Sequence, residues 1–266
     1  MKVATWNING IGRRLPLLFD WLGEAAPDVL CLQELKCSNA SFPAEELEQA
    51  GYGAVWECEG RWNGVAVIAK GSVPLPTCRA LPGSPDDHQA RYIEAAVSGI
   101  VVASIYVPNG NPQPGLKFDY KISWMKRLHR HVGKLIEQEV PTILAGDFNV
   151  APTARDIYDE TTSYRDSALI HPACRRVFLD MLDLGLDDTI RTLFPDNEVY
   201  TFWDYRRHRW ERNAGLRLDY IFADHAMRAI LEEGGIDQPM RSRKNASDHV
   251  PVWVSFGHQF QSRHCN

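Results

Sequence analysis

The sequence predicts an α/β (α+β) fold in which two mixed β-sheets pack face to face and helices cover their outer faces. Three observations support this prediction. Short apolar runs of strand length recur along the whole chain, helical patterns alternate with several of them, and residues 52–107 contain strand after strand. Helices between strands permit parallel pairing, whereas consecutive strands pair antiparallel. Two stacked mixed sheets accommodate this order better than a simple doubly wound sheet.

The expected strands are apolar runs spread over the whole chain. Within the stretch 52–107, the sequence Trp62-Asn63-Gly64 is typical of a hairpin turn between two strands. The clearest runs are residues 2–8, 28–34, 64–70, 100–107, 142–147, 217–223 and 250–256.

Helices are expected between several of these strands. The segment 15–22 places three leucines and Phe19 on one helical face, and residues 42–51 have Pro43 near a helix start and Gly51 just past its end. A longer apolar stripe at spacings of three and four is interpreted as core packing and comprises Phe118, Ile122, Met125, Leu128, Val132, Leu135 and Ile136.

The chain has 266 residues and is 44% hydrophobic, so it can bury a large core. We expect one domain over residues 1–257 and a C-terminal tail over 258–266, in a monomeric protein. No run approaches the roughly 18 apolar residues of a membrane span, and the first residues lack the apolar stretch of a secretory signal. A cytoplasmic protein without a membrane partner is therefore predicted. The six cysteines form no CxxC pair, which favours reduced thiols over disulfides or a zinc site.

The formal net charge of -5 does not by itself indicate a polyanion ligand. Basic residues are nevertheless concentrated in two segments. Residues 204–219 contain five arginines with Tyr205 and Trp210 between them, and residues 240–249 add two arginines and Lys244. These segments could form a basic face or simply a solvated surface, and composition alone favours the second interpretation.

Polar and charged residues recur where the expected strands end. Each of them could be an ordinary cap or turn residue. If the strand ends converge, however, they form an acidic pocket with amides and one imidazole, and oxygen donors of this kind suit Mg²⁺ or Mn²⁺. The residues concerned are Asn7, Glu34, Tyr106, Asp147, Asn149, Asp219, Asp248 and His249.

Several other chemistries find no support. The sequence contains no G-x-S-x-G, no Walker motif and no G-x-G-x-x-G, and its histidines do not assemble into a convincing zinc site. A catalytic histidine needs a partner that fixes its tautomer and orientation. Asp219 is available to His249 if the strand of Asp219 lies beside the strand that follows His249.

The sequence resembles the exonuclease III family of abasic-site endonucleases, within the endonuclease/exonuclease/phosphatase superfamily. The resemblance rests on an ordered set of segments that spans residues 1 to 256. The family has a four-layer αββα sandwich fold, which agrees with the stacked sheets expected above. The matching segments are WNINGI, LQELK, GVAVIAK, YVPNG, GDFNVAPT, FWDYR, LRLDYI and SDHVPVW.

The resemblance implies a role for each residue at the strand ends. Glu34 would bind the divalent metal, with Asn7 and Asp248 close to it. Asp147 would orient and deprotonate the attacking water, with Asn149 hydrogen-bonded nearby. His249 would contact the scissile phosphate, and Asp219 would orient His249. Tyr106 would support the phosphate or the leaving group.

Other positions are implied to recognise DNA. An abasic sugar would enter an apolar pocket formed by Phe202, Leu216 and Leu218, with Trp203 adjacent, although core packing is the alternative for these four. The residues near the DNA backbone would be Arg91, Asn109 and Lys121. Gln113 stands where some relatives insert a basic side chain into the duplex, and residues 153–172 lie in a region that differs among relatives.

The leading functional prediction is a Mg²⁺- or Mn²⁺-dependent DNA repair nuclease. It would incise duplex DNA 5′ to abasic sites, degrade DNA from 3′ ends and remove blocked 3′ ends. One alternative is another superfamily phosphodiesterase or phosphatase, acting on RNA or on a small phosphate ester. A second is a catalytically silent DNA-binding protein, which is disfavoured because every expected catalytic position is filled.

Overall fold

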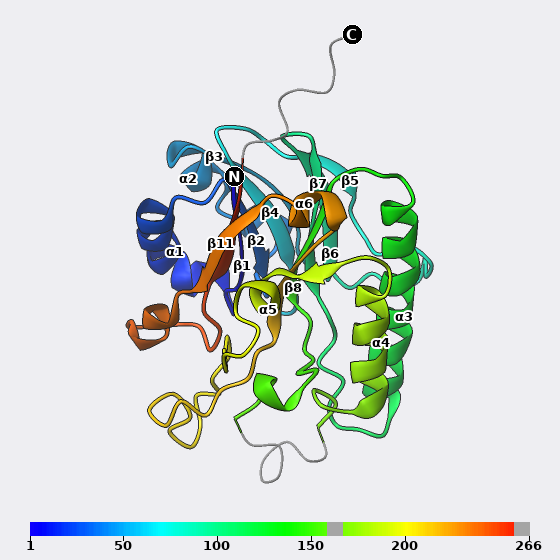
Figure 1. The fold of residues 1–266 in the computed structure, drawn as a ribbon. Helices are drawn as coiled ribbons and strands as arrows, with labels where there is room; N and C mark the ends of the chain where they lie inside the picture. The colour runs from blue at the N-terminus through cyan, green and yellow to red at the C-terminus, as the bar shows by residue number, and fades with distance from the viewer. Residues whose placement is uncertain (159–166, 258–266) are drawn as a thin grey trace.

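The computed structural model consists of two β-sheets stacked face to face, with helices on both outer faces (Figure 1). It describes residues 1–158 and 167–257. The predicted C-terminal tail, 258–266, lies outside the described residues, as does part of the variable region 153–172. The predicted four-layer arrangement of two mixed sheets flanked by helices is confirmed.

The first sheet has six strands and is mixed. Its two central strands, β1 (Lys2–Asn7) and β2 (Val29–Gln33), pair parallel and are connected by helix α1 (Ile11–Ala25), whereas the other pairs are antiparallel. In spatial order the sheet contains β11 (Leu231–Ile236), β12 (Val252–Phe256), β1, β2, β4 (Val65–Lys70) and β3 (Tyr52–Glu57).

The second sheet repeats this plan. Its central strands, β7 (Ile100–Tyr106) and β8 (Thr142–Asp147), pair parallel and are connected by helix α3 (Leu116–Ile136). The other pairs are antiparallel. In spatial order the sheet contains β5 (Leu75–Cys78), β6 (Tyr92–Val97), β7, β8, β10 (Asp219–Ala223) and β9 (Asp187–Asp188).

Each sheet is covered by the helices that its apolar outer face requires. Helices α1 and α2 (Ala44–Gln49) cover the first sheet, and α3 and α4 (Pro172–Leu182) cover the second (Figure 1). The predicted stripes face these sheets: Leu18 and Leu22 of α1 and Leu128 of α3 are buried in the outer cores, and the rest of each stripe is buried or partly buried against them. A third core of small and β-branched residues fills the space between the sheets.

The remaining elements are short. They are the helices α5 (Thr189–Leu193) and α6 (His225–Arg228) and the 3₁₀ turns Asn39–Ser41, Ala154–Asp156 and Gln238–Ser242. None of the helices within the described ranges has both the length and the apolar character that crossing a membrane demands.

The predicted turn at Asn63 and Gly64 lies between β3 and β4, and both residues have positive φ. The connection, residues 58–64, is longer than a two-residue hairpin loop, and the carbonyls of Gly64 and Asn63 accept the N–H groups of Leu35 and Lys36 after β2. A Cβ atom on Gly64 would lie 2.8 Å from Cβ of Leu35, so this close approach requires glycine. The contact holds the residues that follow Glu34.

The strand pairing explains why the polar strand ends converge. Parallel strands end at the same edge of a sheet, so Asn7 lies beside Gln33 and Tyr106 lies beside Asp147. The antiparallel strand β10 begins where β8 ends and places Asp219 opposite Asp147. The same edge of both sheets therefore carries the predicted site.

Candidate active site

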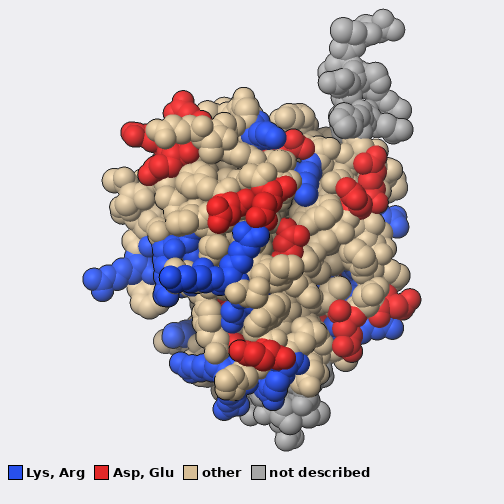
Figure 2. Space-filling model, turned by 90° about the vertical axis from the view of Figure 1, so that its left-hand side faces the viewer, with Lys and Arg blue, Asp and Glu red and all other residues tan. Residues whose placement is uncertain are grey.

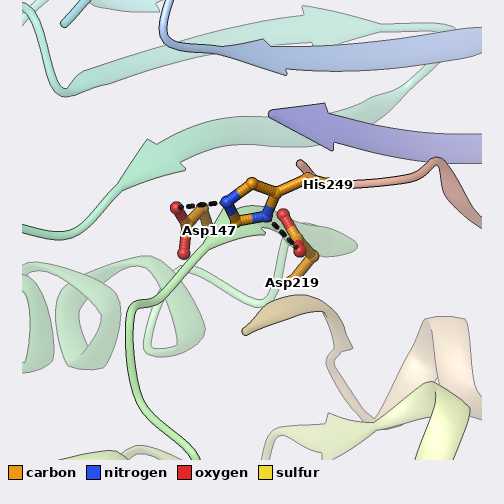
Figure 3. Close-up of side chains that lie close together, drawn as sticks. All are labelled: Asp147, Asp219 and His249. Atoms are coloured by element: carbon orange, nitrogen blue, oxygen red, sulfur yellow. Dashed lines mark hydrogen bonds and ion pairs between the residues drawn. The ribbon is translucent and has the colours of Figure 1, made fainter. Parts of the chain in front are cut away.

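Asp147, His249 and Asp219 form a compact group at this edge (Figure 3). Nδ1 of His249 lies 2.7 Å from Oδ2 of Asp219, and its Nε2 lies 3.8 Å from Oδ2 of Asp147. All three side chains are buried, with His249 5% exposed and each carboxylate 1% exposed. The imidazole thus lies between two carboxylates, and one of its faces is tilted against the ring of Phe202.

Asn7 connects this group to Glu34. Its Nδ2 donates to Oε1 of Glu34 at 3.0 Å and to Oδ2 of Asp147 at 2.9 Å. Its Oδ1 accepts the backbone N–H of Asn9, so the amide orientation is fixed. Because the amide is fully buried, these bonds hold the two carboxylates at a set separation.

Glu34 lies just after β2 and has further partners. Oε1 accepts a hydrogen bond from the Tyr106 hydroxyl at 2.8 Å, and Oε2 lies 2.6 Å from Nζ of Lys36. The backbone of Glu34 has φ 52°, a conformation that costs energy for a residue other than glycine. Such strain persists only where the surrounding contacts enforce it, and here the contacts aim the carboxylate at Asn7.

Asn149 also has positive φ, at 50°, and surrounds Asp147 with donors. Its backbone N–H donates to Oδ1 of Asp147 at 2.9 Å and its Nδ2 lies 3.2 Å from Oδ2. Nδ2 also donates to the carbonyl of Val107, and Oδ1 accepts from Asn109. The first two bonds restrict the position of the Asp147 carboxylate, and the other two fix the Asn149 side chain.

The buried environment shifts the pKa values of Asp147 and His249. Burial raises the pKa of Asp147 to about 7, although the nearby His249 opposes this shift. Burial alone would lower the pKa of His249, but the carboxylates of Asp219 and Asp147 raise it to about 10. Near neutral pH the imidazole is therefore charged, while Asp147 is close to its own titration point.

The pKa of Glu34 shifts in the opposite direction. Burial would raise this pKa, but Lys36 and the hydrogen bonds from Asn7 and Lys36 hold it below its usual value. Glu34 is consequently ionised over the whole neutral range. Burial and the Glu34 carboxylate raise the pKa of Tyr106 well above its usual value, so its hydroxyl remains protonated and can donate.

Two places near the site offer metal-binding groups. Asp147, Asp219 and His249 have ligand atoms within 4.8 Å of one another. Both nitrogens of His249 face carboxylates there, however, which leaves no free imidazole lone pair when the ring is charged.

The second place is the region of Glu34. Nζ of Lys36 lies 2.6 Å from both Oε2 of Glu34 and Oδ1 of Asn9, and Nδ2 of Asn9 donates to Asp248. The oxygens of Glu34 and Asn9 thus already converge on a positive charge. Such an oxygen-only donor set fits a hard divalent cation.

Sequence reasoning missed several residues that shape this site. Asn9 and Lys36 lie beside the predicted residues Asn7 and Glu34, but nothing in their types indicates that they meet. Thr201 donates to Oδ2 of Asp219 at 2.6 Å, and Ser247 donates to the carbonyl of Asn7 at 2.8 Å. Only the three-dimensional arrangement identifies these contacts.

The residues predicted near the DNA backbone differ in their surroundings. Arg91 lies over the ring of Tyr106, with its guanidinium carbon 4.6 Å from the ring centre. Asn109 is exposed and donates to Asn149 at 3.2 Å, and Gln113 is partly exposed in the same loop. These three can be reached from solvent.

Lys121, also predicted near the DNA backbone, has different surroundings. It is fully buried in α3, and its Nζ donates to the carbonyls of Asn109 at 3.1 Å and Asn149 at 2.5 Å. Burial lowers the pKa of this lysine to about 8. The side chain therefore fixes the loops around Asp147.

The predicted apolar pocket lies beside His249. Phe202 is partly exposed and bridges by backbone pairing to both Leu216 and His249. Leu216 and Leu218 are buried with it in a small separate cluster. Trp203 is fully buried in the core under α1 and donates to Asn213, so core packing accounts for its position.

A basic surface adjoins the site. A cavity of about 640 Å³ is lined by Arg13, Arg14, Tyr205, Arg241 and Arg243, together with Asn9. Lys and Arg side chains gather mainly on the lower and left parts of the face in Figure 2, with some acidic residues among them.

Arg217 does not contribute to this basic surface. It is 2% exposed and forms buried ion pairs with Asp156 at 2.7 Å and Asp188 at 2.6 Å. The arginine-rich segment 204–219 is thus only partly a surface feature.

The chain belongs to the Endonuclease/Exonuclease/phosphatase family, which matches residues 4–249. It is similar to the 3′ phosphatase NExo from Neisseria bound to a product DNA hairpin, with 38% identity, a TM-score of 0.94, and coverage of 97% of this chain and 100% of the other. An AP endonuclease from Archaeoglobus fulgidus has 33% identity and a TM-score of 0.92, with coverage of 96% and 99%.

The chain is also similar to a curated exodeoxyribonuclease. The exodeoxyribonuclease of Bacillus subtilis (strain 168) is 30% identical over 259 residues, which is 95% of this chain and 98% of the relative. The resemblance found in the sequence is thus confirmed: the protein is a hydrolase of the exonuclease III/AP endonuclease type.

Proposed function

We propose that the protein is a DNA repair nuclease that hydrolyses phosphodiester bonds in duplex DNA. Its activities would be incision 5′ to abasic sites, 3′ to 5′ exonuclease and removal of 3′ phosphates and other blocked 3′ ends. One observation carries the proposal: a buried imidazole between Asp147 and Asp219 is connected through Asn7 to an ionised Glu34.

Each side chain of the site has a separate role in the hydrolysis. Asp147 has a pKa near neutrality, so its ionised form can accept a proton from an attacking water. The charged His249 can donate to the scissile phosphate and stabilise the negative charge that develops there. Asp219 and Thr201 hold the ring and its carboxylate partner in place. The Tyr106 hydroxyl supplies a further donor beside Glu34.

The family is divalent-metal dependent. We assign the cation to the oxygens of Glu34 and Asn9, with Asp248 and Asn7 close to them, and Mg²⁺ or Mn²⁺ fits this donor set. When bound, such a cation neutralises phosphate charge and assists the departing 3′ oxygen. Lys36 would have to yield its contact with Glu34 to the cation.

Three features favour DNA as the substrate. The basic cavity beside Asn9 can bind backbone phosphates, and Arg91 and Asn109 are accessible near Tyr106 and Asn149. Phe202, partly exposed next to His249, offers an apolar surface to a sugar that has lost its base. NExo is described with a product DNA hairpin, which agrees with this assignment.

An RNA or small phosphate ester remains the alternative substrate. A small-molecule enzyme would not need an arginine-lined cavity outside the catalytic group, so this feature favours DNA. A silent DNA-binding protein is disfavoured, because a buried charged pair such as Asp147 and His249 is costly and brings no benefit to binding alone.

The test is a duplex that carries an internal abasic analogue and separate labels at its two 5′ ends. With Mg²⁺ we expect a discrete incision product 5′ to the analogue and a ladder from the 3′ ends, and a chelator should abolish both. A matched single-stranded RNA and a small phosphate ester are the comparison substrates. Faster cleavage of either comparison substrate than of the duplex would overturn the proposal.

A further inference from the structure

We propose that Cys37 and Cys58 form an oxidisable dithiol, a modification site at which a small-molecule disulfide produces a reversible intramolecular disulfide. Their sulfur atoms lie 3.1 Å apart, although the residues are 21 positions apart in sequence. Both side chains are partly exposed. This site is separate from the catalytic group and does not depend on the proposed function.

The two backbones are held so that the sulfurs face each other. The N–H of Gly60 donates to the carbonyl of Cys37 at 3.0 Å, and the N–H of Cys58 donates to Oδ1 of Asn39 at 2.9 Å. These bonds tie the segment after β2 to the end of β3 on both sides of the pair. Joining the sulfurs, which lie 3.1 Å apart, therefore requires them to approach each other by about 1 Å.

The pair also has the properties of a reactive thiol and its partner. A hydrogen bond from the Cys58 thiol lowers the pKa of Cys37, while the same bond raises the pKa of Cys58. Cys37 is thus the better nucleophile, since the thiolate is the reactive form. Cys58 lines a surface cavity of about 500 Å³, so small reagents can approach the pair.

The other cysteines within the described ranges lack this arrangement. Cys31 and Cys174 are buried, and burial raises the pKa of both. Cys78 is partly exposed, but its thiol donates to the carbonyl of Ala80. Cys78 is consequently a natural control with similar exposure and no thiol partner.

Glutathione disulfide can oxidise Cys37 and Cys58 in two thiol–disulfide exchange steps. The Cys37 thiolate attacks one sulfur of the reagent, an S–S bond to Cys37 forms, and one glutathione leaves as a thiolate. The Cys58 thiol then loses its proton to water and attacks the Cys37 sulfur, which releases the second glutathione. Two protein thiols are oxidised and one glutathione disulfide is reduced to two thiols.

The disulfide would affect the segment next to the site. Cys37 directly follows Lys36, whose ammonium contacts Glu34 and Asn9. In the oxidised protein the loop that carries this lysine is covalently attached to the end of β3. Oxidation thereby restricts the loop that must move when Lys36 gives up its contact with Glu34.

The proposal is tested on the reduced full-length protein treated with glutathione disulfide and mapped as peptides without reduction. We expect a peptide pair linked through Cys37 and Cys58 that disappears on addition of dithiothreitol. Under the same conditions Cys78 should carry at most a mixed disulfide with glutathione. If Cys37 and Cys58 stay free, or end as two separate adducts, while Cys78 is modified, the proposal is wrong.

Two variants sharpen this result. In Cys58→Ser the glutathione adduct on Cys37 should persist, because the resolving thiol is missing. In Cys58→Ala the Cys37 thiol loses its hydrogen bond, so the pH midpoint of its alkylation by iodoacetamide should rise relative to the parent. An unchanged midpoint, or loss of the adduct from Cys58→Ser, would contradict the pairing. Circular dichroism checks that each variant is folded. The peptide mapping of the unmutated protein does not depend on either variant.

Discussion

Asp219 uses its two carboxylate oxygens very differently. Oδ2 accepts from Thr201 and pairs with Nδ1 of His249, whereas the buried Oδ1 has no hydrogen-bond partner within the described residues. A buried carboxylate with one unsatisfied oxygen is costly. We interpret this cost as the consequence of keeping a negative charge beside His249, where it raises the pKa of the imidazole.

The residue-scale prediction concerns the pH dependence of cleavage. The proposed mechanism needs Asp147 ionised and His249 protonated, so the rate should rise as the pH passes about 7 and fall as it passes about 10. Asp219→Asn removes the largest charge that raises the pKa of His249. We expect kcat/KM to fall by about 100-fold or more. In a plot of kcat/KM against pH, the decrease at high pH should begin at a lower pH than in the parent.

The measurement is kcat/KM on an abasic duplex between pH 5 and pH 11 for the parent and Asp219→Asn. Because the amide of Asn has nearly the same size as the carboxylate of Asp, the two proteins differ mainly in the charge at residue 219. A decrease that begins at the same pH in both proteins would show that Asp219 does not control the protonation of His249.

At the scale of elements, the site depends on how α3 and the strand ends are joined. Lys121 projects from α3 and donates to two carbonyls, one in the loop after β7 and one in the loop after β8. A helix on the outer face of the second sheet thereby fixes the residues that surround Asp147. This is a use of a buried lysine that the sequence pattern does not indicate.

Replacing Lys121 by Met should therefore affect both stability and activity. The apolar side chain leaves the carbonyls of Asn109 and Asn149 without their donor, which costs about 2 kcal/mol of unfolding free energy. We expect cleavage to slow by about 10-fold because Asn149 loses its fixed position. Urea unfolding and single-turnover cleavage provide the two readings.

Lys126→Met is the matched control, since Lys126 is an exposed residue of the same helix. Its unfolding free energy should stay within about 0.5 kcal/mol of the parent. If both variants unfold and cleave like the parent, the bonds from Lys121 do not hold these loops.

Gly146 is the second element-scale feature. It immediately precedes Asp147 in β8, and a Cβ atom there would lie 1.9 Å from the carbonyl oxygen of Ile105 in β7. Gly146→Ala should destabilise the protein by about 3 kcal/mol or more, because backbone atoms would have to move. In Gly133→Ala the nearest atom is 3.8 Å away, so this helical variant should be stabilised by about 0.5 to 1 kcal/mol. Thermal and urea unfolding measure both, and equal stability of the two variants would refute the close packing of β7 and β8.

The elements that were predicted from the sequence are those with a local signal. Strands such as β1 and β8 and the helix α3 have apolar patterns within a few residues, and the sites at the ends of strands follow from parallel pairing. The burial of Lys121 and Arg217 was not predictable in this way. A charged residue within or beside an apolar run gives no sign of which group it pairs with, and the partners Asn149 and Asp156 are distant along the chain.

The active site shows the same distinction. Asp147, His249 and Asp219 were expected to meet because each lies at the end or start of a strand. Parallel pairing of β1 and β2 also brings the segments of Asn9 and Lys36 together, but the side-chain contact between these two residues has no signal in the sequence. Residue types alone give no preference for that pair.

At the scale of the whole molecule, a mildly acidic protein presents an arginine-lined cavity next to its catalytic group. Its overall charge would disfavour DNA, so the local surface must supply the attraction. Arg13 is exposed at this cavity and interacts with Asn245 at 3.3 Å. Arg13 is therefore suited to contact a backbone phosphate.

Arg13→Ala should weaken DNA binding equally for all sequences and reduce the salt dependence. We expect the slope of log affinity against log salt concentration to fall in magnitude by about 1. Lys134→Ala, which changes an exposed residue of α3, should leave the slope unchanged. Fluorescence anisotropy at several salt concentrations measures the slopes, and a slope that Arg13→Ala does not alter would exclude this surface from the DNA interface.

If residues from distant strands form one catalytic group that cleaves DNA, single-turnover cleavage of an abasic duplex, with DNA affinity measured in parallel, will show it. Asp147→Asn and His249→Ala should each abolish detectable cleavage, while the fold and most of the affinity persist. Cleavage by either variant at the rate of the parent would show that the replaced residue is not part of the catalytic group.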